Sequence, residues 1–140
     1  MTSKNTILPQ LPSQLNLRMS GHTRMRRLQQ EQIDFISEEY GIEFAQITNQ
    51  VTGEKWLFSG DRRNVGIELP GGDQTMGDWW WDWHNHPSGS SAASTDDMYL
   101  LGKWIAAQRD GRGPIQSSST IYPTGKKPFE FTPINPRVEK

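Results

Sequence analysis

The 140-residue sequence contains no cysteine. This absence excludes disulfide bonds, thiolate nucleophiles and metal centres with cysteine ligands. The sequence also has no excess of charge of either sign, because 15 Lys and Arg residues stand against 16 Asp and Glu residues, for a formal net charge of −1. Proteins that bind nucleic acid usually present a basic surface, so we expect no nucleic-acid partner.

Long apolar runs are missing as well. No segment approaches the roughly 18 to 20 apolar residues that are needed to cross a membrane. The first ten residues, MTSKNTILPQ, lack the apolar core of a secretory signal. We therefore expect a soluble, cytoplasmic protein that does not associate with membranes.

The sequence does contain enough large apolar side chains for one domain. Six Trp and five Phe residues compensate for a hydrophobic content of 33%, and chains of about 100 to 150 residues commonly form a single core. Residues 1–14 hold two prolines and many small polar side chains, which predicts a flexible N-terminal arm. Residues 15–140 are predicted to form the single domain.

Hydrophobic periodicity predicts the secondary structure of this domain. Alternation in 15–19 predicts a strand, and helical spacing from Thr23 to Glu39, followed by Gly41, predicts the first helix. The later predicted elements are a hairpin of strands at 42–48 and 55–59, a glycine-rich connection at 60–77, a strand at 78–84, a helix at 96–110, and strands at 117–123 and 128–133. This order indicates an α+β fold with a central mixed sheet.

The predicted strand at 78–84, DWWWDWH, is rich in Trp. A period of two predicts a core-facing set, Trp79, Trp81 and Trp83, and an opposite set, Trp80, Asp82 and His84. Two interpretations of the second set remain open. Either Trp80 and Asp82 border a substrate, or Trp80 packs in the interior and Asp82 orients a histidine ligand of a metal.

Residues 84 to 97, HNHPSGSSAASTDD, contain two of the three histidines. In a strand, His84 and His86 project to the same side. On a helix, Ser94 and Asp97 share one face, and the loop between the two pairs is long enough to bring them together. Two imidazoles and a carboxylate are ligands that zinc prefers, and three protein ligands leave a fourth position for water, as in catalytic zinc sites. The pattern predicts one zinc ion per chain, bound by His84, His86 and Asp97.

The same residues also have a structural explanation. Pairs of the type H-x-H occur by chance, and STDD before an apolar helix is a typical N-cap with Ser94 or Thr95 at the capping position. It is the combination of the two halves, and neither half alone, that favours the metal site.

The spacing of these residues resembles the JAMM motif of the MPN-domain zinc metalloproteases. The motif is H-x-H-P at 84–87, with seven residues between His86 and Ser94 and two between Ser94 and Asp97. The resemblance implies that His84, His86 and Asp97 bind zinc and that Ser94 helps to position the oxyanion. It also implies a cytidine-deaminase-like three-layer α/β/α fold with one helix on each side of the sheet. HNHPSG at 84–89 looks like the RadC branch of the superfamily too, but the later Asp-His pair of that branch is missing.

The family also uses a glutamate, near the end of the first helix or the start of the next strand, which takes a proton from the zinc-bound water. SEEYGIEF at 37–44 offers Glu38, in an E-x-x-G pattern with Gly41, and Glu39, in an E-Y-G pattern. Glu43 is a third candidate. The alternative is that these are solvated glutamates at a helix end.

The resemblance implies zinc-dependent hydrolysis of a peptide or isopeptide bond by metal-activated water. The implied substrates are proteins or peptides, including conjugates of a ubiquitin-like modifier. Eukaryotic members that are specific for ubiquitin chains carry insertions, some with a second zinc held by Cys and His, which this short chain does not have. Two other interpretations are a catalytically silent MPN-like module that binds a partner protein, and a protease domain of the effector or toxin type. Intact ligands argue against the silent module.

Overall fold

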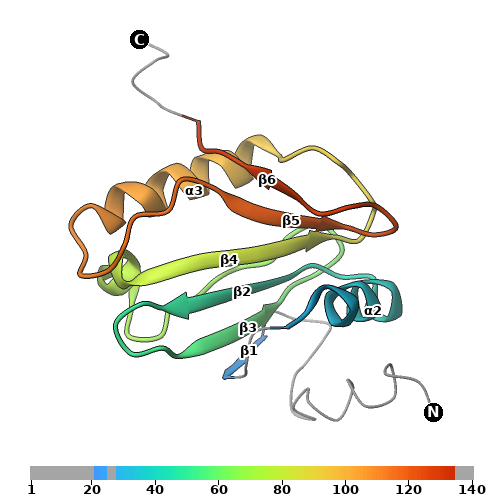
Figure 1. Ribbon diagram of the computed structural model, residues 1–140. Coiled ribbons are helices and arrows are strands. Elements are labelled where there is room, and N and C mark those ends of the chain that lie inside the picture. Colours follow the sequence, from blue (N-terminus) through green and yellow to red (C-terminus); the bar gives the residue numbers. More distant parts are fainter. Residues whose placement is uncertain (1–20, 25–27, 135–140) are drawn as a thin grey trace.

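The computed structural model describes residues 21–24 and 28–134, whose strands form one sheet in the order β1-β3-β2-β4-β5-β6 (Figure 1). The strands are Gly21–Arg24 (β1), Phe44–Asn49 (β2), Lys55–Ser59 (β3), Trp79–His86 (β4), Ser119–Pro123 (β5) and Phe129–Phe131 (β6). β4 and β5 run parallel, and the other neighbours are antiparallel. The sheet is therefore mixed, and with its helices it belongs to the α+β class, as predicted.

The described helices are α2 (Gln30–Tyr40), α3 (Thr95–Gln108) and the 3-10 helix η2 (Asp73–Asp78), which lies in the predicted glycine-rich connection. α2 ends where it was predicted to end, because Gly41 adopts the left-handed conformation with φ 63° and caps the helix. Its predicted start at Thr23 is wrong. Gly21–Arg24 pair with β3 as a strand instead, so hydrogen bonding to an open sheet edge outweighs the local helical spacing. The predicted arm at 1–14 and strand at 15–19 lie outside the described residues.

The β2–β3 hairpin is confirmed. Gly53 has a φ of 81°, and its N–H donates to the carbonyl of Asn49 over 2.8 Å. The Asn49 side chain accepts from the backbone N–H groups of Val51 and Thr52, which closes the turn locally. The later predicted helix and the two last strands are confirmed as α3, β5 and β6.

Two clusters of buried side chains lie on opposite faces of the sheet. Leu57 and Phe58, neighbours in β3, belong to different clusters, and neighbours in a strand point to opposite faces. The α2 cluster includes Ile33 and Ile36, and the α3 cluster includes Leu101 and Trp104. Figure 1 shows the two helices on different sides of the strands. Within the described ranges, no helix is long and apolar enough to cross a membrane.

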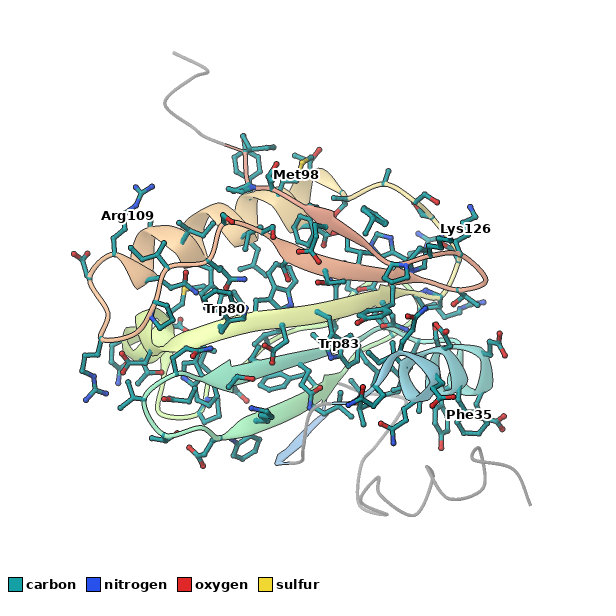
Figure 2. The ribbon with its side chains drawn as sticks, viewed as in Figure 1. Phe35, Trp80, Trp83, Met98, Arg109 and Lys126 are labelled. Carbon is teal, nitrogen blue, oxygen red and sulfur yellow. The ribbon has the colours of Figure 1, made fainter. Side chains whose placement is uncertain are left out.

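The predicted faces of the Trp strand are corrected by a β-bulge. Trp83 pairs with Gln46 and Trp81 with Ile47, which are neighbours in β2, so the register skips Asp82 and β4 has one extra residue there. The extra residue reverses the alternation. Trp79 and Trp81 therefore lie in the α3 cluster, whereas Trp83 lies in the α2 cluster. Figure 2 labels Trp83 on β4 near α2.

The bulge also changes the neighbours of His84. Because of it, Trp81 and His84 lie on the same face although they are three residues apart, and their rings stack at a centroid distance of 4.9 Å. The carboxylate of Asp82 accepts a hydrogen bond from the Thr48 hydroxyl. His84 has no hydrogen-bond partner for either ring nitrogen, so Asp82 does not orient this ring.

Candidate metal centre

The C-terminal end of β4 brings two imidazoles to the N-terminus of α3. His84 Nε2 lies 3.1 Å from Asp97 Oδ2, and His86 Nε2 lies 3.4 Å from the same oxygen. One donor atom from each of the three residues lies within 4.8 Å of the others. Ligand atoms about 2.0 to 2.2 Å from a tetrahedral zinc lie roughly 3.3 to 3.5 Å apart. The spacing between each imidazole and the carboxylate therefore suits one small metal ion.

His84 is held by packing and not by hydrogen bonds. Its side chain is 1% exposed. The ring stacks on Trp81, which in turn stacks on Trp104, and it contacts the Phe131 ring in a T-shaped arrangement. Both ring nitrogens are buried without a hydrogen-bond partner, and the short contact with Asp97 does not have hydrogen-bond geometry. A buried polar group without a partner is costly. A metal ion bound at Nε2 would satisfy the nitrogen that faces Asp97.

His86 is oriented by the loop that follows it. Its Nδ1 lies 3.0 Å from the carbonyl oxygen of Ser90. A carbonyl can only accept, so Nδ1 carries the hydrogen, and in the neutral ring Nε2 has a free lone pair. In that form the lone pair faces the Asp97 carboxylate, which is also an acceptor, so the two groups cannot form a hydrogen bond with each other. Either a proton on Nε2, which would then donate to Asp97 Oδ2, or a metal ion between the two atoms resolves this contact. The Ser90 carbonyl keeps the hydrogen on Nδ1 and so leaves Nε2 as the nitrogen that would bind a metal.

Asp97 is held in place by a capping box with Ser94. The Asp97 N–H donates to Ser94 Oγ over 3.0 Å, and the Ser94 N–H donates to Asp97 Oδ2 over 3.1 Å. Ser94 is therefore the N-cap, as the structural explanation predicted. Its hydroxyl accepts in this bond, so its own hydrogen stays available for another acceptor, and the side chain is exposed at the cavity.

Two of the three groups are held in the ionisation state that binds a metal. Burial lowers the pKa of His84 despite the opposing effect of Asp97. Burial would raise the pKa of Asp97, but its contacts with His84 and His86 hold that pKa well below its usual range. In His86, burial lowers the pKa, yet Asp97 and the Ser90 carbonyl outweigh it and raise the pKa overall. A neutral His84 and an ionised Asp97 are the forms that bind a metal, and His86 would release its proton on binding.

A cavity of about 610 Å³ opens over the three residues. Its lining includes Glu43, Arg62, and Ser88 and Ser90 of the loop after β4. A cavity of this size is typical of sites for small ligands or for a short stretch of peptide.

The structure does not bring Glu38 or Glu39 to this cavity. Both side chains are exposed on α2, and neither lines the cavity. Glu43 lines it instead. Its pKa is raised from 4.5 to about 8, mainly because the carboxyl group is partly buried and because Asp97 and Asp61 are nearby, while His86 opposes the shift. A divalent cation at the centre would lower this pKa, since positive charge favours the carboxylate.

The segment that carries Glu43 is held to β4 by Asn85, the residue between the two histidines. Asn85 is fully buried. Its Oδ1 accepts from the Phe44 N–H, and its Nδ2 donates to the Ile42 carbonyl over 3.0 Å and to Ser37 Oγ over 2.9 Å. The bonds to Ile42 and Phe44 clamp the chain on both sides of Glu43, so one strand positions both the histidines and this carboxylate.

The alternation of apolar and polar residues in IEF, at 42–44, favours Glu43, although the sequence analysis ranked it behind Glu38 and Glu39. Ile42 and Phe44 are buried in the α2 cluster, so the residue between them points to the other face. His84 packs on Trp81, which belongs to the cluster on that other face. A glutamate between two core residues, beside a strand with H-x-H, is thus a better candidate than a glutamate on a helix end.

Comparison of the chain with protein-family models, with curated proteins and with solved structures finds no match in any of the three. The proposed function therefore rests on the geometry of the metal centre and its cavity.

Proposed function

We propose that this protein is a zinc-dependent hydrolase of peptide or isopeptide bonds with a JAMM-like centre. The observation that carries the proposal is the buried His84 ring without hydrogen bonds, facing His86 and Asp97 in a cavity that also contains Glu43. Two imidazole donors and one carboxylate favour zinc among the divalent metals of cells. Helices on both faces of a mixed sheet also agree with a cytidine-deaminase-like layer arrangement.

We assign each residue of the cavity a separate role in hydrolysis. Zinc, when bound, acidifies water and polarises a carbonyl group. Glu43 takes the proton from the attacking water and then delivers it to the leaving amine, with Asn85 holding the segment that bears it. Ser94 donates its hydroxyl hydrogen to the oxygen that gains negative charge at the carbonyl. Trp81 and Phe131 keep the His84 ring in place, and the Ser90 carbonyl keeps His86 in the required tautomer.

The test uses purified full-length protein, elemental analysis and a panel of substrates. The panel contains a mixture of peptides and a set of lysine conjugates of ubiquitin-like modifiers. We expect one zinc per chain and hydrolysis that stops with a chelator and returns with zinc. Zinc binding without hydrolysis of any substrate would favour the silent binding module, and absence of zinc after growth in zinc-rich medium would contradict the proposal.

Ser94→Ala separates capping from catalysis. Loss of the cap should cost about 0.5 to 2 kcal/mol of stability. Loss of the donor should reduce turnover per folded molecule by about 10² to 10³ with zinc still bound. Ser88→Ala, which removes a hydroxyl from the same cavity, is the matched control. A stability loss with full turnover in Ser94→Ala would leave Ser94 with a capping role alone.

Asn85→Asp tests the clamp around Glu43. The new oxygen would face the Ile42 carbonyl in place of the donated hydrogen, so stability should fall by about 1 to 3 kcal/mol. A displaced Glu43 should reduce turnover by up to about 10²-fold, with one zinc retained. Ser37→Ala breaks a bond of Asn85 that does not flank Glu43, and should have little effect on turnover. Equal turnover losses in the two variants would show that Asn85 acts through general stability.

A further inference from the structure

A tight turn after β3 presents two arginines to the cavity. Asp61 Oδ1 accepts from the backbone N–H groups of Arg63 and Asn64, each over 2.8 Å, and the Asp61 N–H donates to the Asn64 carbonyl. A Cβ added at Gly60 would lie 1.9 Å from the Asn64 carbonyl oxygen, so the backbone closes too tightly there for a side chain. The turn is therefore defined by its own hydrogen bonds.

The same turn is bonded to the segment that carries Glu43. The Glu43 N–H donates to the Asp61 carbonyl over 2.7 Å, and the Gly60 N–H donates to the Glu43 carbonyl over 2.8 Å. The position of the turn relative to the metal centre is thus set by backbone hydrogen bonds, and does not depend on long side chains.

Among the described residues, no ion pair engages the guanidinium groups of Arg62 and Arg63. Arg62 and Arg63 are exposed, and both line the cavity that contains Glu43, His84 and Asp97. In the part of the chain that the structure describes, the arginine with an ion pair is Arg112, which binds Asp78 outside this cavity. Asp61, in the same turn, accepts from the backbone N–H groups of Arg63 and Asn64, and these bonds, together with the weaker effect of the charges of Arg63 and Arg62, lower its pKa.

The charges of the cavity lie unevenly. The loop between β4 and α3 contributes small, neutral side chains to the lining, namely Pro87, Ser88, Ser90, Ala92 and Ala93. Three carboxylates line the cavity: Glu43 and Asp97, whose charges a bound divalent cation would offset, and the exposed Asp96 in the first turn of α3. Two unpaired arginines beside such a centre attract an anion, and the planar guanidinium group matches a carboxylate in particular.

We propose that Arg62 and Arg63 form a carboxylate-binding subsite, so that the preferred substrate carries an acidic group close to the bond that is hydrolysed. The inference rests on the proposed function, since it places the reacting bond at His84, His86 and Asp97. The carboxylate has two possible sources in a peptide, an acidic side chain or a free C-terminus.

Three matched probes distinguish these sources and do not require turnover. Each is a short peptide with an N-terminal succinyl hydroxamate, a group that binds zinc. The first has Asp and an amidated C-terminus, the second has Asn in place of Asp, and the third has Asn and a free C-terminal carboxylate. Their dissociation constants are measured by calorimetry with zinc-loaded full-length protein.

We expect a carboxylate probe to bind about tenfold more tightly than the neutral probe. This preference should disappear in the double variant Arg62→Gln, Arg63→Gln and should weaken with added salt. Arg109→Gln, at the C-terminal end of α3 (Figure 2), should keep the preference. Tighter binding of the first probe identifies an acidic side chain, and tighter binding of the third identifies a free C-terminus.

Two results would contradict the inference in different ways. Equal affinities of the three probes for the wild-type protein would contradict the carboxylate subsite and leave the proposed zinc centre unaffected. Failure of every probe to bind the zinc-loaded protein would count against the proposed metal centre itself, and the subsite would fall with it.

Discussion

Glu43→Gln should reduce turnover by about 10² to 10⁴ while one zinc per chain is retained. The substitution keeps the size of the side chain and removes the carboxylate that we propose takes the proton from water. Glu38→Gln and Glu39→Gln are the matched controls, because both residues are exposed on α2 away from the cavity. We expect wild-type turnover from both, measured with zinc content and folded fraction held equal. A wild-type rate in Glu43→Gln, together with a loss of turnover in either control, would show that the general base is Glu38 or Glu39 at the end of α2.

The pH dependence of stability gives a second measurement on the same variant, in metal-free protein. The pKa of Glu43 is raised from 4.5 to about 8 in the folded chain, so the folded state holds a proton that the unfolded state has lost between these values. The stability associated with this proton is complete below about pH 4.5 and is lost as the pH rises toward 8. Glu43→Gln cannot lose a proton there, so denaturant titrations should show it gaining stability over wild type, by on the order of a few kcal/mol at pH 9.

Asp97→Asn should abolish stoichiometric zinc binding and the stabilisation that zinc provides. Zinc at about 100 times its dissociation constant stabilises a folded protein by about 2.7 kcal/mol, which for a chain of 140 residues corresponds to roughly 9 °C in Tm. The variant keeps an oxygen that can accept from the Ser94 N–H, so the fold should survive. Scanning calorimetry with zinc and with a chelator checks the shift.

Asp96→Asn, next in the chain, is the control for the change of charge. Asp96 lines the cavity but does not belong to the cluster of three possible ligands. It should keep the full zinc-dependent shift in Tm. The same shift in Asp97→Asn as in wild type would show that Asp97 does not bind the metal.

Much of the secondary structure could be predicted because its signals are local. The β2–β3 turn depends on Asn49 and Gly53, and the end of α2 depends on Gly41, all of which act through their own backbone conformation or nearest neighbours. The exception is Gly21–Arg24. The apolar residues that follow this segment recur at helical spacing, but the segment itself pairs with β3, which lies more than thirty residues further along the chain. Pairing with a strand so distant in sequence cannot be detected from the hydrophobic pattern of the segment itself.

The three possible metal ligands were visible in the sequence because H-x-H and S-x-x-D are short-range patterns. A strand projects residues at i and i+2 together, and a helix does the same at i and i+3. The sequence by itself thus determined which donor types occur and in what local pairs.

The tertiary structure alone decided which other groups join them. The bulge at Asp82 turned His84 onto Trp81, against the simple alternation of the strand. The pairing of β2 with β4 placed Glu43, and not Glu38 or Glu39, in the cavity. Register and bulges depend on hydrogen bonds between distant segments, so neither the neighbours of the histidines nor the nearest glutamate could be read from local spacing.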